Sequence, residues 1–416
     1  MGAQNLMSEV SLPPILRPLT TGRIAWLWGG LALSGVGDQL FIVVLGWLSV
    51  KTFGTDAGLL TSLQAAVALT TALLAGRVTD GFSHRTAMIG ADLLRGAVLS
   101  GMVVVWLVLG DPPGWALVVC VLALAMGQSV FRPALIAVIP EMADVEQLPA
   151  TNALFDTTER IARLLGPGFI GVLGAALPLV HFVTVDVVTF LTSAAAVASS
   201  VPVRRAVVPI RHGLWQSLSR GFVAIRRHRL LAFTLMTGGI INGAWNIAYF
   251  VGLPLMLVQG GVAGGIGAYG LVISAYGLTN LASTLVVGNR PMSRHPARMI
   301  FGGNLVSGCG YLALGLAGML PSGFMLAGLM GAALLSAIGG PMQDITNATV
   351  RQTLLEPGEI APAARAFLVL NQLGLLVGLL ISPLLFAGIG VPLTVILGGG
   401  AVIFVGIAGF FRFGRD

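Results

Sequence analysis

The sequence predicts an all-α membrane protein with twelve transmembrane helices in two pseudo-symmetric six-helix bundles. Hydrophobic residues make up 56% of the 416 residues and charged residues only 9%, with a mean hydropathy of +0.92. Soluble domains carry about 25% charged residues. Apolar runs long enough for a bilayer core of about 30 Å recur along the chain. These runs are continuous rather than alternating, which argues against a β-barrel.

Short polar breaks separate the expected helices. The polar segment 1–22 precedes a full-length span with further spans behind it, so we do not expect a cleaved signal peptide. The expected spans are 24–50, 57–78, 86–109, 114–140, 150–176, 179–201, 230–257, 263–288, 298–319, 321–349, 362–387 and 390–411.

Arginines in the breaks predict the orientation. Basic residues gather in the breaks after even-numbered spans and at both chain ends, whereas Lys51 is the one clear exception after an odd-numbered span. Because cytoplasmic loops carry the excess of Lys and Arg, both termini are expected in the cytoplasm. The expected location is the inner (plasma) membrane of a bacterium.

The longest hydrophilic stretch, 202–229, divides the chain near its midpoint and contains seven arginines and no acid. Its second part, GLWQSLSRGFVAIRRH, has apolar residues at helical spacing, which suits a helix at the membrane interface. We therefore expect an N-terminal bundle over 1–201, a basic cytoplasmic linker over 202–229 and a C-terminal bundle over 230–416. Nucleic-acid binding is a poor interpretation of this charge.

A weak internal repeat supports the division into halves. A shift of 212 positions aligns AMG at 125–127 with AIG at 337–339, Phe155 with Phe367, and Gly166 with Gly378. Two parallel six-helix halves are typical of alternating-access transporters.

The loop after the second span reads GRVTDGFSHRT and resembles the signature loop of the major facilitator superfamily. Gly76, Asp80 and Arg85 match that pattern, whereas Gly81, Ser83 and His84 depart from it. The resemblance implies the major facilitator fold and a conformational latch in this loop. Asp80 follows a helix C-terminus, where the helix dipole disfavours a carboxylate, and Arg85 is the nearby cation. The alternative is a surface ion pair of little energetic value.

Further segments resemble the drug- and siderophore-exporting branch of that superfamily. They are GDQLF, ADLLRG, FRPALIAVIPEM, LPATNALF and GPGFIG, the last being a partial match to the antiporter signature. This resemblance implies secondary active transport, with export of amphipathic organic compounds. Pro167 lies inside the fifth span and is expected to bend it.

Charged residues within the spans are costly and usually face protein or water. Asp92 and Arg95 are spaced i, i+3, and Asp156–Arg160 and Glu159–Arg163 are spaced i, i+4, so each pair shares a helix face. We expect these six residues to form a charge network that braces the first half near the signature loop. We expect Asp186 to have a structural role rather than a role in transport.

Asp38 is the candidate for proton coupling. It lies about midway along the first span, with no basic neighbour in that helix. Burial favours the neutral acid, which can then load and release a proton as access alternates. The alternative is a carboxyl group that bonds a neighbouring helix for structure.

A polar and aromatic helix face is expected to line the substrate cavity. In the seventh span, Asn242, Trp245, Asn246 and Tyr249 recur at i, i+3, i+4 and i+7. Packing and interhelical hydrogen bonding are the alternative. The other candidate cavity residues are Phe41, Gln128, Arg132, Gln343, Asp344 and Asn347.

Arg132 and Asp344 occupy equivalent positions in the two halves under the repeat shift. We hypothesise an ion pair that forms between them when the cytoplasmic gate closes. The alternative is that each pairs within its own half.

Motifs of several other classes are missing from the sequence. Lys51 is the only lysine and no glycine-rich phosphate loop occurs, and neither HExxH nor GxSxG is present, so no enzyme activity is expected. Cys120 and Cys309 indicate neither a disulfide framework nor a metal site.

The expected function is a monomeric proton-coupled antiporter that uses the proton gradient and no cofactor or metal. Its partners would be protons, membrane lipids and a small amphipathic compound, such as a drug or siderophore. The alternatives are a lipid or lysolipid flippase, an importer, or a non-transporting membrane sensor or scaffold.

Overall fold

The computed structural model describes residues 14–79, 83–174, 176–203, 214–289 and 293–414, and these residues are helical apart from short connections. The predicted all-α class is therefore confirmed. Asp80, Gly81 and residues 204–213 of the predicted linker lie outside the described residues.

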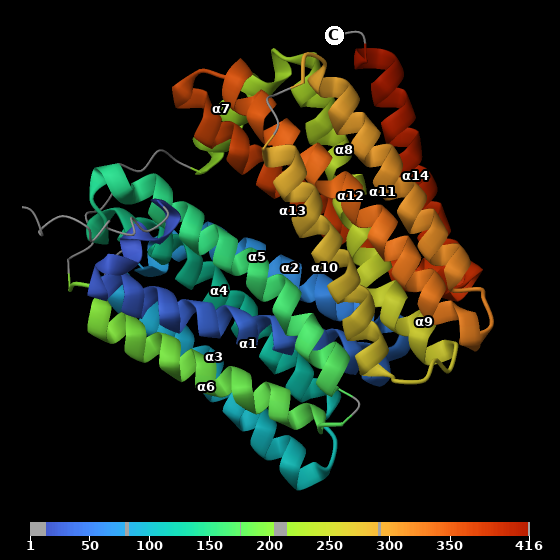
Figure 1. Ribbon diagram of the computed structural model, residues 1–416, viewed down its shortest axis with the longest axis horizontal. Helices are drawn as coiled ribbons and strands as arrows, with labels where there is room; N and C mark the ends of the chain where they lie inside the picture. Colours follow the sequence, from blue (N-terminus) through green and yellow to red (C-terminus); the bar gives the residue numbers. More distant parts are fainter. Residues whose placement is uncertain (1–13, 80–82, 175, 204–213, 290–292, 415–416) are drawn as a thin grey trace, which may run out of the picture.

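The first half of the chain forms six long helices (Figure 1). A 3₁₀ turn, Gly54–Asp56, joins the first two of them in one nearly continuous helical run. Ser83 caps the third helix, because its side chain accepts a hydrogen bond of 3.1 Å from the Thr86 N–H. The helices are α1 (Gly22–Phe53), α2 (Ala57–Thr79), α3 (His84–Leu109), α4 (Gly114–Met142), α5 (Leu148–Leu173) and α6 (Leu179–Ser200).

The second half begins with the short helix α7 (Leu214–Arg226). A π-helical turn, Ile247–Gly252, links α8 (Arg229–Asn246) to α9 (Leu253–Gln259). Such turns widen a helix locally and are frequent at functional sites. The remaining helices are α10 (Ile266–Gly288), α11 (Pro296–Ala317), α12 (Ser322–Leu354), α13 (Pro357–Ile389) and α14 (Val391–Phe413).

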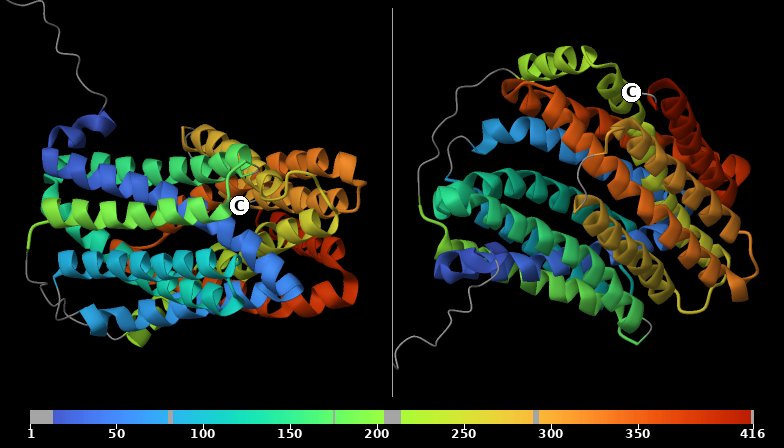
Figure 2. Two further views of the ribbon diagram at one scale, coloured as in Figure 1. Left: turned by 90° about the horizontal axis from the view of Figure 1, so that it is seen from below. Right: turned by 45° about the horizontal axis from the view of Figure 1, so that its top comes forward.

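The helices pack in two groups that are inclined to each other (Figures 1 and 2). In the first group α1 packs on α5 and α6, and α3 packs on α4 and α6. In the second group α11 packs on α12 and α14, and α8 packs on α13. The groups meet mainly through α5 with α10 and α2 with α13.

The two groups are in close contact at the end remote from the chain termini. A Cβ atom on Gly270 of α10 would lie 2.6 Å from the Gly171 nitrogen and 2.7 Å from the Pro167 oxygen of α5. A Cβ atom on Gly58 of α2 would lie 3.1 Å from the Leu379 oxygen of α13. Since only glycine permits such an approach, these backbones close that end of the molecule.

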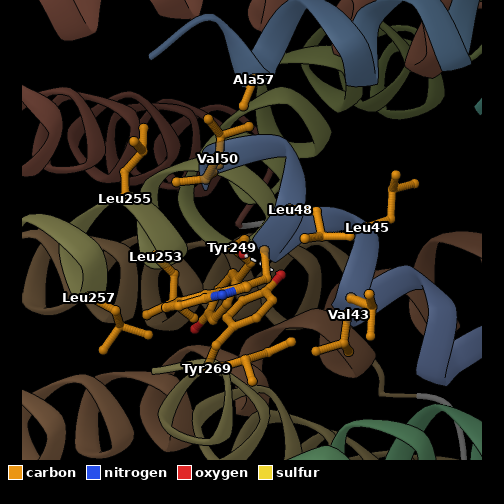
Figure 3. Packing of buried hydrophobic residues seen from close by; sticks show 14 of the residues in the cluster. Val43, Leu45, Leu48, Val50, Ala57, Tyr249, Leu253, Leu255, Leu257 and Tyr269 are labelled. Carbon is orange, nitrogen blue, oxygen red and sulfur yellow. Dashed lines mark hydrogen bonds between the residues drawn. The ribbon is translucent and has the colours of Figure 1, made fainter. Parts of the chain in front are cut away.

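Apolar side chains from both groups complete this closure (Figure 3). Val43, Leu48 and Val50 of α1 belong to the same buried cluster as Leu253 and Leu257 of α9. The core of the protein is therefore continuous across the two groups at this end.

Ten segments of the described residues are long and apolar enough to cross a membrane. The predicted first and second spans fall in a single run, Gly22–Thr71, and α5 is not among the ten. Helix α5 carries Asp156, Glu159, Arg160 and Arg163, which lower its mean hydropathy. The chain is thus an integral membrane protein by composition and helix length, and the total of twelve spans remains a prediction.

Helix α7 forms where the amphipathic segment was predicted, but the apolar residues near its C-terminus are covered by protein. Ala224 and Ile225 are buried with neighbours from α13 such as Ala363 and Phe367. A Cβ atom on Gly221 would lie 2.3 Å from the Pro362 oxygen. This helix therefore packs against the start of α13.

Candidate functional site

A cavity of about 720 Å³ lies between the two helix groups. Its walls come from α1 and α5 of the first group and from α8, α10, α11, α12 and α13 of the second. Cavities that bind drug-sized molecules have volumes of about 300–1,000 Å³. The space is thus adequate for an organic molecule of that size.

Aromatic rings gather around the π-helical turn at one part of the cavity. The ring centroids of Tyr249 and Tyr276 are 4.8 Å apart, and Trp245 lies 6.1 Å from each of them. Tyr311 lies 6.1 Å from Tyr249, and Phe250 lies 5.3 Å from Trp245. We call these five residues the aromatic group. All five line the cavity.

Two hydrogen bonds hold the centre of this group. The hydroxyls of Tyr249 and Ser336 are hydrogen-bonded to each other. The Tyr269 hydroxyl donates to the backbone oxygen of Tyr249 over 3.2 Å, a contact that Figure 3 shows from nearby. Tyr249 is 1% exposed, so its ring is packed against neighbours on nearly all sides.

Amide side chains form most of the polar lining. Buried amide oxygens of Asn304 and Asn371 have no hydrogen-bond partner among the described residues, and an unpaired buried polar atom is unfavourable. Both residues line the cavity, so a movement of either side chain would bring its oxygen within reach of a donor group of a ligand. The amides that line the cavity are Gln39, Asn242, Asn280, Asn304, Gln343, Asn347, Asn371 and Gln372.

Four charged residues also line the cavity. Arg160 and Arg163 come from α5, and Asp344 and Arg351 come from α12. Arg160 Nε lies 3.0 Å from an oxygen of Asp156, four residues earlier in the same helix. Arg163 lies 3.4 Å from Glu159 with the same spacing. Both predicted i, i+4 pairs of α5 are therefore present.

The structure brings together most of the residues expected at the cavity. Asn242, Trp245, Tyr249, Gln343, Asp344 and Asn347 line it. Asn246 instead lines a neighbouring cavity of about 260 Å³. Phe41 is 0% exposed in the apolar core. Neither Gln128 nor Arg132 lines either cavity.

Sequence reasoning missed the three tyrosines Tyr269, Tyr276 and Tyr311. The first two are seven residues apart in α10, the spacing that places both on one helix face. That spacing was a usable signal. Tyr311 stands alone in α11, and only packing brings it to the aromatic group.

Asp38 belongs to a buried charge network centred on Arg95. Arg95 Nη1 lies 4.0 Å from an oxygen of Asp38, and Nη2 pairs with Asp92. Arg95 also donates to the Gln128 side-chain oxygen over 3.0 Å, and Asp92 accepts a hydrogen bond of 2.7 Å from Ser193. Asp38 has no basic neighbour in its own helix, and its cation is instead Arg95 of α3.

The surroundings of the network enclose it in protein. The Arg95 guanidinium lies over the Phe190 ring at 4.3 Å and near the Phe131 ring at 5.1 Å. Asp92 is 0% exposed, whereas the Asp38 side chain is 27% exposed. Asp186 is also 0% exposed, and one of its oxygens has no partner among the described residues. Asp38 is therefore the accessible acid of the network.

Arg132 pairs within its own half. Its guanidinium makes two contacts with the Glu159 carboxylate, at 2.8 and 3.2 Å. Glu159 also contacts Arg163, so one carboxylate links α4 to α5. In this conformation Arg132 therefore pairs with Glu159 of its own half and not with Asp344.

The predicted latch is described only in part. Gly76 lies near the end of α2, and Asp80 lies outside the described residues. Arg85, near the start of α3, donates a hydrogen bond to the Ala198 backbone oxygen near the end of α6. This contact ties α3 to α6 close to the signature loop.

Comparisons with known proteins identify a family and a related sequence. The Major Facilitator Superfamily profile matches residues 27–338. Macrolide efflux protein A of Streptococcus pyogenes is 22% identical over 407 residues, with 92% of this chain and 93% of that protein covered.

Solved structures of transporters share the fold. A bacterial homologue of the iron transporter ferroportin, in an inward-facing state, matches with a TM-score of 0.68 and 16% identity, and 95% of this chain and 99% of that chain are covered. The nucleoside transporter NupG matches with a TM-score of 0.72 and 13% identity, and 94% and 99% of the two chains are covered.

Proposed function

Because the chain belongs to the Major Facilitator Superfamily, we propose that it exports amphipathic organic compounds in exchange for protons, by alternating access. The observation that carries this proposal is the cavity of about 720 Å³ between the two helix groups, with an aromatic group and many amides in its walls. Aromatic and apolar walls with a few placed polar groups suit an amphipathic ligand. The likeness to macrolide efflux protein A favours export.

The proposed transport cycle uses the contact between the helix groups. In the present conformation α5 and α10 are in backbone contact at the end remote from the termini. Rocking of one group against the other would open that end and close the end that carries both termini. We place the termini in the cytoplasm of a bacterium, so that the cavity receives substrate from inside the cell.

Proton coupling is proposed to use Asp38. Its contact with Arg95 is at the 4.0 Å limit of an ion pair, and Arg95 is already paired with Asp92. Asp38 therefore releases its cation more readily than Asp92 does. A proton on Asp38 would replace this contact, and movement of α1 against α3 would follow from its gain or loss.

The test uses everted membrane vesicles that are energised by respiration. A fluorescent indicator follows the pH gradient while cationic drugs, neutral drugs, siderophores and lysolipids are added singly. Wild type, Asp38→Asn and the control Asp111→Asn, whose carboxyl is exposed between α3 and α4, are compared. We expect an exported compound to collapse the gradient with wild type and the control but not with Asp38→Asn.

Two other results are informative. An equal response from all three proteins would retain antiport and remove Asp38 from coupling. No response to any compound would contradict proton-coupled export, and the flippase, importer and sensor alternatives would then lead.

A further inference from the structure

The α12 wall of the cavity carries one acid and one arginine, and neither has a charged partner within ion-pair distance among the described residues. Asp344 is exposed to the cavity, and its carboxylate receives a single long contact of 3.5 Å from the Gln343 amide. The Arg351 guanidinium lies over the Phe367 ring at 4.4 Å. No described carboxylate pairs with Arg351.

The opposite wall does not supply the missing partners. Arg160 is engaged by Asp156, and Arg163 is engaged by Glu159. Neither Arg160 nor Arg351 lies within ion-pair distance of Asp344. Hydrogen bonds between groups of opposite charge are stronger than those between neutral groups, so a ligand that supplies the opposite charge to Asp344 or Arg351 gains free energy in the cavity.

The two unpaired charges have a defined separation. Asp344 and Arg351 are seven residues apart in α12, so they lie on the same helix face and their Cα atoms are about 10 Å apart along the axis. Asp344 lines the same cavity as the aromatic group, and a Cβ atom on Gly340, one helical turn before Asp344, would lie 3.9 Å from the Tyr276 hydroxyl. One acid beside several aromatic rings is a favourable site for an organic ammonium.

Arg351 suits the complementary anion. Because the face of its guanidinium lies on the Phe367 ring, its N–H edge remains available. That edge can bind a carboxylate or a phosphate through two parallel hydrogen bonds. The stacking also restricts the side chain, which reduces the entropy lost when an anion binds.

We infer that the cavity selects zwitterionic amphipaths, with an ammonium at Asp344 and the aromatic group and a carboxylate or phosphate about 10 Å away at Arg351. This inference rests on the proposed function, since it takes the cavity to be the transport site. A cation alone leaves Arg351 uncompensated, and an anion alone leaves Asp344 uncompensated. The zwitterion compensates both charges at once.

Four compounds with one aromatic body test this selectivity. The parent is a biphenyl with an aminomethyl group at one end and a carboxylate at the other. Its methyl ester is only cationic, its N-acetyl derivative is only anionic, and the doubly blocked compound is neutral. Binding to the purified full-length protein in lipid nanodiscs is measured by calorimetry. We expect the zwitterion to bind about tenfold or more tightly than each blocked compound.

Two variants assign the charges. Asp344→Asn should abolish the advantage of the zwitterion over the anion, because only the ammonium site is lost. Arg351→Gln should abolish its advantage over the cation. Glu359→Gln is the matched control, since Glu359 pairs with Arg227 outside the cavity lining at 2.8 Å, and it should leave the order of affinities unchanged. Lysophosphatidylcholine is the fifth ligand: its ammonium and phosphate are much closer together than about 10 Å, so it should bind no more tightly than the singly charged biphenyls, and tighter binding would contradict the required spacing.

Several results would overturn the inference. One is a singly charged biphenyl that binds as tightly as the zwitterion. Another is that none of the four biphenyls binds. The third is that the zwitterion keeps its higher affinity over both singly charged compounds in the two variants.

Failure of this inference is distinct from failure of the proposed function. Vesicle transport of a singly charged compound retains export and rejects zwitterion selectivity, whereas selective binding without any vesicle response retains the site and rejects proton-coupled export.

Discussion

Arg95 of α3 lies 4.0 Å from Asp38 of α1, while the same guanidinium pairs with Asp92 of its own helix. One buried cation thus serves two carboxylates with unequal contacts. The closer contact is completely buried, and the longer one involves an acid that is 27% exposed. This inequality gives the two acids different expected roles.

Asp38→Asn should separate transport from coupling. The amide cannot take up and release a proton, so transport driven by a pH gradient should fall at least about tenfold. Exchange of labelled for unlabelled substrate, which needs no gradient, should continue in proteoliposomes. A variant with unchanged gradient-driven transport would exclude Asp38 from coupling.

Arg95→Gln should destabilise the protein by about 3–5 kcal/mol, because it leaves the completely buried Asp92 without its cation. The thermal unfolding midpoint of the purified protein measures this loss. The double variant Arg95→Gln/Asp92→Asn should recover part of the stability, since it removes the uncompensated charge. An additive loss in the double variant would show that the pair is not coupled.

Exchange of charges should identify the partner of Arg132. Its two contacts with Glu159 predict that Arg132→Glu/Glu159→Arg retains more transport than either single change. These side chains are 54% and 34% exposed, so the effect on stability should be at most about 1 kcal/mol. The exchange Arg132→Glu/Asp344→Arg should not rescue transport. Rescue by this exchange would show that Arg132 and Asp344 pair in the other conformation.

Gly270→Val should separate α10 from α5 at the closed end. A Cβ atom there would lie 2.6 Å from the Gly171 nitrogen, so the backbones have to move apart. The matched control on the same interface is Gly277→Ala, whose Cβ atom would have its nearest neighbour, Leu164 Cδ1, at an ordinary 3.5 Å. The valine variant should favour the conformation that is open at this end.

Accessibility of a cavity cysteine measures that shift. Ile273 lines the cavity and is replaced by cysteine after both native cysteines, Cys120 and Cys309, have been changed to alanine. An impermeant thiol reagent added from the side remote from the termini should label the Gly270→Val protein several times faster than the Gly277→Ala protein. Equal labelling rates would contradict the role of the α5–α10 contact as a gate.

The composition and helical periodicity by themselves determined the helical membrane class and one wall of the cavity. Apolar runs of membrane length allow few alternatives to helices, because backbone polar groups in lipid have to bond within the chain. The i, i+3 and i+7 spacing from Asn242 likewise places Trp245 and Tyr249 on one face, and the three residues line the cavity.

The tertiary structure decided the partners between helices. The cation beside Asp38 comes from a residue 57 positions later in the chain, and Tyr311 reaches the aromatic group from a helix of its own. Periodicity indicates which face of a helix carries the polar and aromatic residues. It does not indicate which neighbouring helix that face contacts, or at which position along the helix axis. Those depend on helix rotation and on close glycine contacts such as Gly270 against Gly171, which exist only after the two groups have packed.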